Sequence, residues 1–265
     1  MADSWIKSRV FVGGDLDGGA VLALDAGPAH HLTHVLRLKA GDGVAVFNGR
    51  DGEWHARIDG IRKASCSVVV ETQLRPQSRE PDLWLLFAPI KRVPINFLAQ
   101  KATELGVSAL WPVITAHTQI ARVNTARLQA NAIEAAQQCE RLGVPEIFQP
   151  KPLAEVMDTW PRSRRILWCD ESGGGEPIAA ALSGLREGGD TAIPRAVPWA
   201  VLIGPEGGFA ATELDGLRKL PFVTPVTLGP RVMRADTAAL AALACWQAVL
   251  GDWQTNQRKT RSAKS

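Results

Sequence analysis

The sequence predicts a mixed α/β protein in two parts, a small all-β part followed by a larger part built on a mostly parallel sheet. Three observations carry this prediction: short β-like runs between glycine turns up to residue 74, a proline-rich charged stretch at 75–82, and alternating strands and helices after it. The chain has 265 residues, of which 46% are hydrophobic and 22% charged. It is therefore long enough for two cores and too apolar for a disordered protein.

The first part, residues 1–74, combines short strands with one short helix. This texture favours a small β-barrel or a β-sandwich, forms that often serve as binding platforms. The expected strands are Arg9–Val12, Ala20–Asp25, Gly43–Asn48, Glu53–Ile61 and Ser65–Thr72, and the expected helix is Pro28–Leu38. Residues 75–82 carry two prolines and four charges without apolar periodicity, so we expect a linker there.

In the second part, residues 83–250, unbroken apolar runs alternate with helical stretches, which is typical of a parallel sheet covered by helices. The expected strands are Leu83–Ala88, Ala109–Ile114, Arg165–Cys169, Trp199–Ile203 and Val223–Leu228, and the expected helices are Ile95–Leu105, Ala126–Arg141, Pro177–Arg186, Ala211–Leu220 and Asp236–Leu250. The last helix is apolar on nearly every side. We therefore expect it to be buried all round, in the core or against another subunit.

The net charge of +3 comes entirely from the last residues of the chain. Residues 251–265 carry four basic residues and one aspartate, whereas residues 1–250 carry 26 basic and 26 acidic residues. We expect a flexible basic tail at 251–265. An RNA surface on the folded body must then be a local cluster.

Cysteine and histidine spacing argues against a metal site. The four cysteines form no CxxC pair, so we expect free thiols. His30 and His34 would share a helix face, but no third ligand accompanies them at a clear spacing, so we expect no metal. The apolar stretch 235–251 is too short for a membrane span and no leader is evident, which predicts a cytoplasmic protein without a membrane partner.

Two loops that follow predicted strands carry the candidate chemistry. The loop Gly204–Phe209 contains three glycines, which allow a backbone to approach a ligand closely. The loop 229–237 places Arg231 and Arg234 beside the start of the last helix. Ligands in open α/β sheets bind where strands end, and the planar arginine fork suits phosphate or a developing oxyanion. The loops together predict an electrophile near the glycines and a polyanion near the arginines.

These loops belong to a wider pattern of sequence blocks. The blocks are Ile203–Phe209 (IGPEGGF), Leu228–Ala239 (LGPRVMRADTAA) and Gln100–Gly106 (QKATELG), with Ala135–Arg141, Val144–Ile147 and His31–Leu38 in addition. In content, order and spacing they closely resemble the signature blocks of the ribosomal RNA small subunit methyltransferase E family, a branch of the knotted SPOUT methyltransferases. The resemblance covers almost the whole chain.

The resemblance implies an S-adenosylmethionine-dependent enzyme that methylates N3 of one uridine in 16S ribosomal RNA, free or in the small ribosomal subunit, and that works as a homodimer. It implies a PUA-like RNA-binding β-barrel at 1–74 and a SPOUT α/β domain at 83–250 with a C-terminal trefoil knot. By position, the cofactor contacts would come from Leu202, Ile203, Gly204, Pro205, Glu206, Gly207, Gly208, Leu228, Gly229, Pro230, Val232 and Met233.

Uracil N3 carries a proton, so the enzyme must help that proton leave or stabilise the anion, and the base must be presented unpaired. Arg231 and Arg234 are the candidates for holding phosphate or neutralising charge on the uracil oxygens. Glu206 or Asp236 is the candidate proton acceptor. The alternative is that Glu206 only orders its loop and Asp236 only caps its helix.

Other basic residues are candidates for RNA contacts. They are Arg9, Arg37, Lys91, Arg92, Lys101 and Arg141. Lys101 has a structural alternative, because it stands three residues before Glu104 at helical spacing.

The chain departs from the family pattern at four positions. Glu140 stands where relatives often have Gly, His117 where they often have Arg, Gly143 where a basic residue is frequent, and Asp236 where many have Glu. Two alternative functions stay open: a SPOUT enzyme with another RNA target, such as a ribose 2′-hydroxyl, and a non-catalytic RNA-binding or assembly protein.

Overall fold

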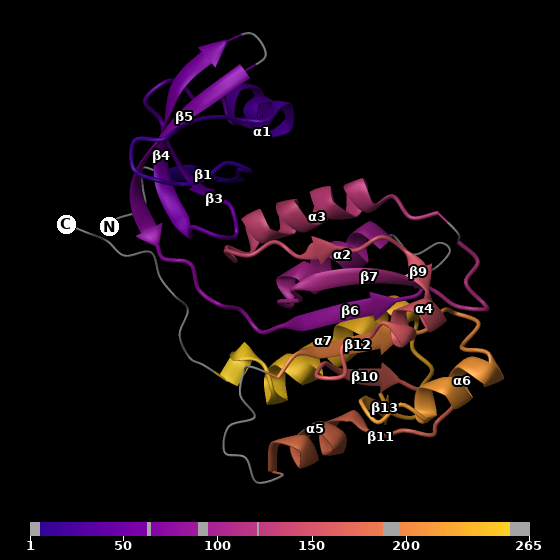
Figure 1. The fold of residues 1–265 in the computed structure, drawn as a ribbon. Coiled ribbons are helices and arrows are strands. Elements are labelled where there is room, and N and C mark those ends of the chain that lie inside the picture. The colour runs from indigo at the N-terminus through magenta and orange to yellow at the C-terminus, as the bar shows by residue number, and fades with distance from the viewer. Residues whose placement is uncertain (1–5, 63–64, 90–94, 121, 188–196, 255–265) are drawn as a thin grey trace. The chain divides into compact units, whose positions relative to one another are not determined.

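The computed structural model describes residues 6–62, 65–89, 95–120, 122–187 and 197–254. They form two compact units, and each is described by itself (Figure 1). The first contains the described residues up to Arg79 together with 136–144, and the second contains 80–135 and 145–254. The division falls inside the expected linker. The segment 136–144 differs from expectation, because it groups with the first unit.

The first unit is built on a five-stranded sheet with the order β1-β3-β4-β5-β2. Its strands are β1 (Ile6–Phe11), β2 (Val21–Ala23), β3 (Gly43–Phe47), β4 (Glu53–Arg62) and β5 (Ser65–Arg75). β1 pairs with β3 in parallel and the other pairs are antiparallel. Every second residue of β5 from Cys66 to Val70 is buried in one apolar core, as the period of a strand requires. Closure of this sheet into a barrel stays a prediction.

The helix expected at Pro28–Leu38 is shorter and irregular. It consists of α1 (Ala26–His30) and a π-helical turn over His31–Val35. The Leu36 N–H bonds to the His31 carbonyl, five residues back, and Arg37 has a φ of 55°. A non-glycine residue in this left-handed region ends a helix at a cost in backbone energy.

The second unit contains one sheet with the order β11-β13-β10-β12-β6-β7-β8, and all of its pairs are parallel. The strands are β6 (Leu83–Phe87), β7 (Ala109–Ile114), β8 (Glu146–Ile147), β10 (Arg165–Cys169), β11 (Glu176–Pro177), β12 (Trp199–Ile203) and β13 (Val223–Thr227), with β9 (Lys151–Pro152) beside β7. The predicted parallel sheet is confirmed. The two-residue strands β8, β9 and β11 are additions to it, and the trefoil knot stays a prediction.

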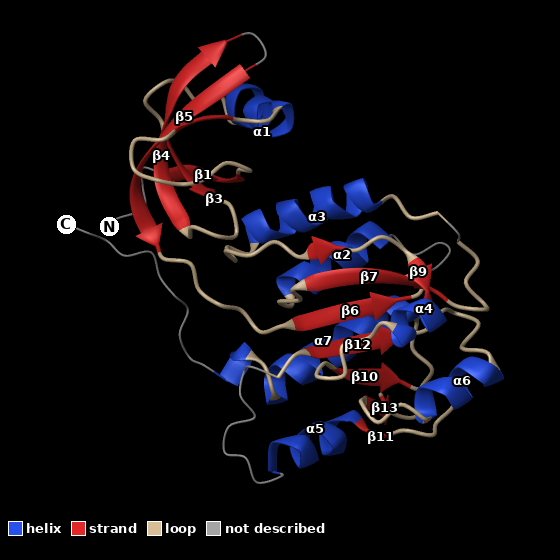
Figure 2. Ribbon diagram, in the orientation of Figure 1, coloured by secondary structure: helices blue, strands red, loops and turns tan. Residues whose placement is uncertain are grey.

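Helices cover both faces of this sheet (Figure 2). One face packs against α2 (Ile95–Glu104), α3 (Thr125–Gln138), α5 (Ile178–Glu187) and α7 (Ala235–Val249), and the other against α4 (Leu153–Asp158) and α6 (Ala211–Arg218). Along β6, Leu83, Leu85 and Phe87 belong to the first core and Leu86 to the second. α4 is the helix that the sequence pattern did not predict.

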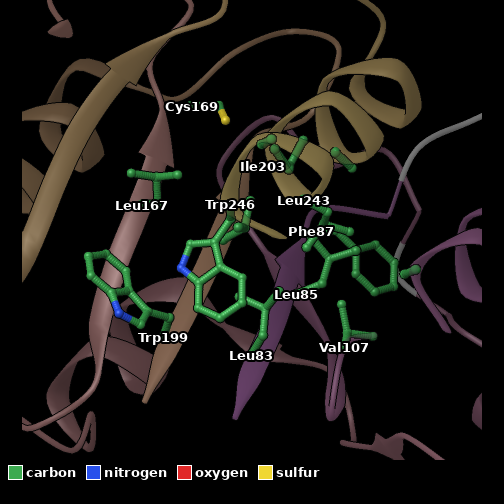
Figure 3. Packing of buried hydrophobic residues seen from close by; sticks show 14 of the residues in the cluster. Leu83, Leu85, Phe87, Val107, Leu167, Cys169, Trp199, Ile203, Leu243 and Trp246 are labelled. Carbon is green, nitrogen blue, oxygen red and sulfur yellow. The ribbon is translucent and has the colours of Figure 1, made fainter. Parts of the chain in front are cut away.

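Among the described residues, α7 is covered on one side and only half-buried on the other, so burial of its second side, against another subunit, stays a prediction. Leu243 and Trp246 belong to the core that contains Leu83 and Leu85, and Trp246 lies beside these two leucines (Figure 3). The opposite side, with Leu240, Ala241 and Ala244, is only half-buried. This apolar face is therefore left for another contact. Over the described parts of the chain, none of the helices combines the length and the hydropathy that crossing a membrane would require.

Candidate functional site

Three loops meet around one pocket of about 550 Å³ in the second unit. They follow the neighbouring strands β10, β12 and β13, and they contribute residues 170–173, 204–206 with 208, and 228–234. Because the strands are parallel, their carboxyl ends lie at the same edge of the sheet. The volume is within the range of small-molecule and cofactor sites.

Most of the residues expected at the cofactor line this pocket. They are Ile203, Gly204, Pro205, Glu206, Gly208, Leu228, Gly229, Pro230, Val232 and Met233, and Arg231 and Arg234 lie in the same wall. Leu202 instead lies in the core on the far side of its strand, and Gly207 is not a lining residue.

The loop after β10 was not among the predicted site residues. It brings Asp170, Glu171, Ser172 and Gly173 to the pocket. A signal was present in the sequence, because CDESGGG directly follows a predicted strand and ends in three glycines. The Asp170 carboxylate is buried and accepts hydrogen bonds from the Ser172 N–H at 2.9 Å and the Ser172 hydroxyl at 2.6 Å, which orders this loop.

Gly204 and Gly208 make room mainly for neighbouring side chains. A β-carbon at Gly204 would lie 2.6 Å from the Phe209 ring, and one at Gly208 would lie 2.6 Å from Glu171 Oε1. Gly208 also has a φ of +68°, which favours glycine. At Gly207 the nearest atom is His117 Cβ at 3.4 Å, an ordinary contact. Gly204 and Gly208 therefore let the loop pack tightly against neighbouring side chains. The close approach of a ligand to this backbone, which the glycines also allow, stays a prediction.

Hydrogen bonds fix the backbone of this loop at three successive positions. The Gly208 N–H donates to the Pro205 carbonyl at 2.9 Å, and the Phe209 N–H to Glu171 Oε1 at 3.2 Å. The Ala210 N–H donates to Glu213 Oε2 at 2.9 Å, at the start of α6. The loop is thus ordered by side chains from two other segments.

The arginine loop leads into α7. Arg231 and Arg234 are exposed, and Arg234 is the N-cap residue of α7 without a capping bond from its side chain. Asp236 lies in the first turn, where its Oδ1 accepts the Thr237 N–H at 2.8 Å. Asp236 is not a lining residue, whereas the exposed Glu206 is. Of the two candidate acids, Glu206 is therefore the one at the pocket.

One thiol also lies at the pocket. Cys169 is the last residue of β10, it lines the pocket, and it is buried. Burial raises the pKa of the Cys169 thiol to about 12, so the sulfur stays protonated at neutral pH.

The residues proposed for RNA contacts differ in their surroundings. Arg9 is a correction: it is buried, its guanidinium donates to Glu53 and to backbone carbonyls within the first unit, and it stacks on the Phe47 ring 3.6 Å away. Arg37 is exposed. Lys101 donates to Glu104 at 2.7 Å, as its structural alternative required.

The remaining candidates differ in what the structure describes. Arg141 is half-buried and its carbonyl accepts a bond from Arg9. Lys91 and Arg92 lie outside the described residues, as does most of the basic tail. Among the side chains that the structure describes, no three His, Cys, Asp or Glu converge as a metal site, and the His30 and His34 rings stack 4.6 Å apart.

Comparison with known proteins gives matches over both parts of the chain. Residues 77–247 match the family model of an RNA methyltransferase domain, and residues 24–71 match that of an RNA methyltransferase PUA domain. The ribosomal RNA small subunit methyltransferase E of Rickettsia conorii is 34% identical over 215 residues, which are 81% of this chain and 84% of that protein.

Two solved structures share the fold over most of both chains. A putative methyltransferase from Legionella pneumophila, in complex with the bound cofactor SAM, is 28% identical with a TM-score of 0.76, over 92% of this chain and 98% of that one. A ribosomal RNA small subunit methyltransferase E from Neisseria gonorrhoeae has a TM-score of 0.78 at 24% identity, over 93% of this chain and 99% of that one. The mixed α/β fold and the PUA-like first part predicted from the sequence are confirmed.

Proposed function

Because the chain belongs to the ribosomal RNA small subunit methyltransferase E family, we propose that it transfers the methyl group of S-adenosylmethionine to N3 of a uridine in 16S ribosomal RNA. The observation that carries the proposal is the convergence of three strand-end loops on one pocket, with glycine-rich backbone in one loop and two exposed arginines in another. The reaction product is 3-methyluridine.

The pocket fits this cofactor in size and in chemistry. Its volume of about 550 Å³ suits a ligand of cofactor size, and its walls present backbone from the loops that follow β12 and β13. The carboxylates of Asp170, Glu171 and Glu206 lie among its lining residues, which favours a cation such as an amino group or a sulfonium. The similar Legionella protein, which is in complex with SAM, supports the same assignment.

When bound, S-adenosylmethionine supplies an electrophilic methyl group on its sulfonium. The chain's residues then have two tasks at the uracil ring. Arg231 and Arg234 neutralise the negative charge that grows on the uracil oxygens as N3 loses its proton, or hold the adjacent phosphate. Glu206 accepts that proton, because it lines the pocket from within the glycine loop, whereas Asp236 is not a lining residue. The N3–carbon bond forms as the sulfur–carbon bond breaks, and the electron pair returns to sulfur.

We further propose that the first unit presents the RNA, because the acids and arginines just assigned to the chemistry lie in the second unit. Arg37 is the exposed candidate for a phosphate contact on the first unit. A homodimer would cover the half-buried face of α7 with Leu240, Ala241 and Ala244. A reaction on ribosomal RNA also implies a cytoplasmic location.

The test is nucleoside mass spectrometry of 16S ribosomal RNA from cells with and without this protein. We expect 3-methyluridine to disappear in its absence and to return with the wild-type gene. Loss of a 2′-O-methylated nucleoside in its place would favour the alternative RNA target. An unchanged nucleoside profile would favour a non-catalytic role.

A further inference from the structure

The loop after β7 contacts the glycine loop of the pocket from the side of His117. His117 Nδ1 lies 3.1 Å from the Gly207 carbonyl oxygen and 3.0 Å from the Gly208 carbonyl oxygen. Both oxygens are acceptors, so Nδ1 must carry the hydrogen and donate it to them. The residue before His117 is also held: the backbone N–H of Ala116 donates to the Glu213 side chain at Oε1, 2.9 Å away.

These contacts place the glycine loop between two side chains. A β-carbon at Gly207 would face His117 at 3.4 Å, and one at Gly208 would face Glu171 at 2.6 Å. Glu171 holds the Phe209 N–H, and His117 holds the two preceding carbonyl groups. Peptide orientation in this loop is thus set by a donor and an acceptor from two different strand ends.

His117 is exposed and is not a lining residue of the pocket, so its effect passes through the loop. The loop's own residues Pro205, Glu206 and Gly208 do line the pocket. A site that binds a ligand through backbone groups depends on fixed peptide orientations, because ordering them at binding costs affinity.

We propose that His117 is a positioning residue for the cofactor, which holds the Gly207 and Gly208 peptides in the orientation that binds S-adenosylmethionine. The inference rests on the proposed function for the identity of the ligand and on the hydrogen bonds of Nδ1 for the mechanism. One donor at the Nδ1 position carries the role, and the imidazole ring itself is dispensable.

Two variants with amide side chains test whether the role needs a donor at the position of Nδ1 or the imidazole ring itself. In His117→Asn the side-chain amide nitrogen can take the place of Nδ1, whereas in His117→Gln the longer side chain carries its amide nitrogen nearer the place of Nε2. His117→Ala removes the donor altogether. A general need for a polar side chain predicts equal behaviour of Asn and Gln, and a need for the Nδ1 donor predicts that Asn alone replaces histidine.

The first readout needs no cofactor. Amide hydrogen exchange of a peptide covering 204–210 should rise about tenfold in His117→Ala and His117→Gln and stay within about twofold in His117→Asn, with a peptide covering 83–87 in the central sheet of the second unit as the reference for opening of that unit. The second readout is calorimetry with S-adenosylmethionine. We expect a Kd at least about fivefold higher in Ala and Gln and an unchanged Kd in Asn.

Unchanged exchange in His117→Ala, or Asn behaving like Ala, would overturn the inference, as would an equal rise at 83–87. A wild-type protein that does not bind S-adenosylmethionine would instead overturn the proposed function. The exchange experiment would still decide whether His117 holds the loop, so the two failures are distinguishable.

Discussion

Arg9 Nε donates to Glu53 Oε2 at 3.1 Å inside the first unit, where the Glu53 side chain is fully buried. Arg75 donates to the same oxygen. Arg9 also donates to the carbonyl oxygens of Ala136 and Arg141, at 2.6 Å each. One carboxylate therefore balances two guanidinium groups, and both of them also donate to backbone carbonyls at the end of α3 and in the turn that follows it.

Replacing this carboxylate tests its structural role. Glu53→Gln removes the charge that both guanidinium groups share, so we expect the free energy of unfolding to fall by about 3–5 kcal/mol. Urea unfolding measures it. Glu104→Gln, which breaks the exposed pair with Lys101, is the control and should cost less than about 1 kcal/mol. Equal losses in the two variants would contradict the role of the buried carboxylate.

In the glycine loop, alanine substitutions at the neighbouring positions Gly207 and Gly208 should differ in their effect on cofactor affinity. Gly208→Ala forces a side chain onto a φ of +68° and against Glu171, a strain of about 1–2 kcal/mol. We expect its S-adenosylmethionine affinity to fall by about tenfold. Gly207→Ala makes only an ordinary contact with His117, so its affinity should stay within about twofold. Calorimetry that finds the opposite order would contradict this account of the loop.

Arg234 is expected to act on the RNA or on the transition state. It is exposed and stands at the positive N-terminal end of α7, where another cation gains nothing from the helix dipole. Arg234→Ala should lower the methylation rate by at least about tenfold, or about 1.4 kcal/mol in the barrier. Tm and cofactor affinity should change little. If affinity falls in parallel with the rate, Arg234 belongs to the cofactor site and Arg231 becomes the substrate-facing residue.

Among the described residues, two non-glycine residues have positive φ values, and replacing each by glycine should have the same effect on stability but different effects on RNA methylation. Glu140 and Arg37 have φ values of 61° and 55°, and a glycine at either position relieves the left-handed strain. Because glycine also makes the unfolded chain more flexible, we expect a net gain of about 0.5–1 kcal/mol from Glu140→Gly and from Arg37→Gly. Only Arg37→Gly should weaken methylation of RNA. Thermal unfolding and a methylation assay measure the two effects, and a loss of activity in Glu140→Gly would contradict this division.

The face of α7 gives a prediction about assembly. Sedimentation at micromolar concentration should show twice the chain mass of 28.6 kDa, because a dimer covers the apolar side with Leu240. Leu240→Glu should shift the equilibrium to the monomer. Ile61→Glu adds the same charge at an exposed apolar position of the first unit and should leave the mass unchanged. A wild-type mass near 28.6 kDa would rule out the dimer.

The sequence predicted those strands and helices whose hydrophobic pattern is visible within the element itself. Strands such as Trp199–Ile203 are continuous apolar runs, because both of their faces are covered. The two-residue strand Glu146–Ile147 and the short helix Leu153–Asp158 have no such pattern, since pairing with β7 and packing on the sheet decide them. The same limit applies to Arg9, whose partners lie 44 and 127 residues away, so its charge alone suggested RNA.

The candidate site was predictable where glycine and arginine mark a strand end. Glu140 stands where relatives often have Gly. The structure gives a reason for that preference, because residue 140 has a left-handed backbone, which glycine adopts without strain. The pattern marks the loop that carries Glu171 as a glycine-rich strand end, but it does not predict the hydrogen bonds of Glu171 and His117. Their importance depends on which peptide groups they meet after folding, and neither residue type signals that contact.

The high pKa of the Cys169 thiol affects whether S-adenosylmethionine would methylate this side chain. A methyl sulfonium alkylates thiolates, and Cys169 lies in the wall of the pocket that would hold it. With a pKa of about 12, the sulfur carries its hydrogen through the whole physiological range and is a poor nucleophile. Burial of this one side chain therefore makes the Cys169 sulfur a poor methyl acceptor.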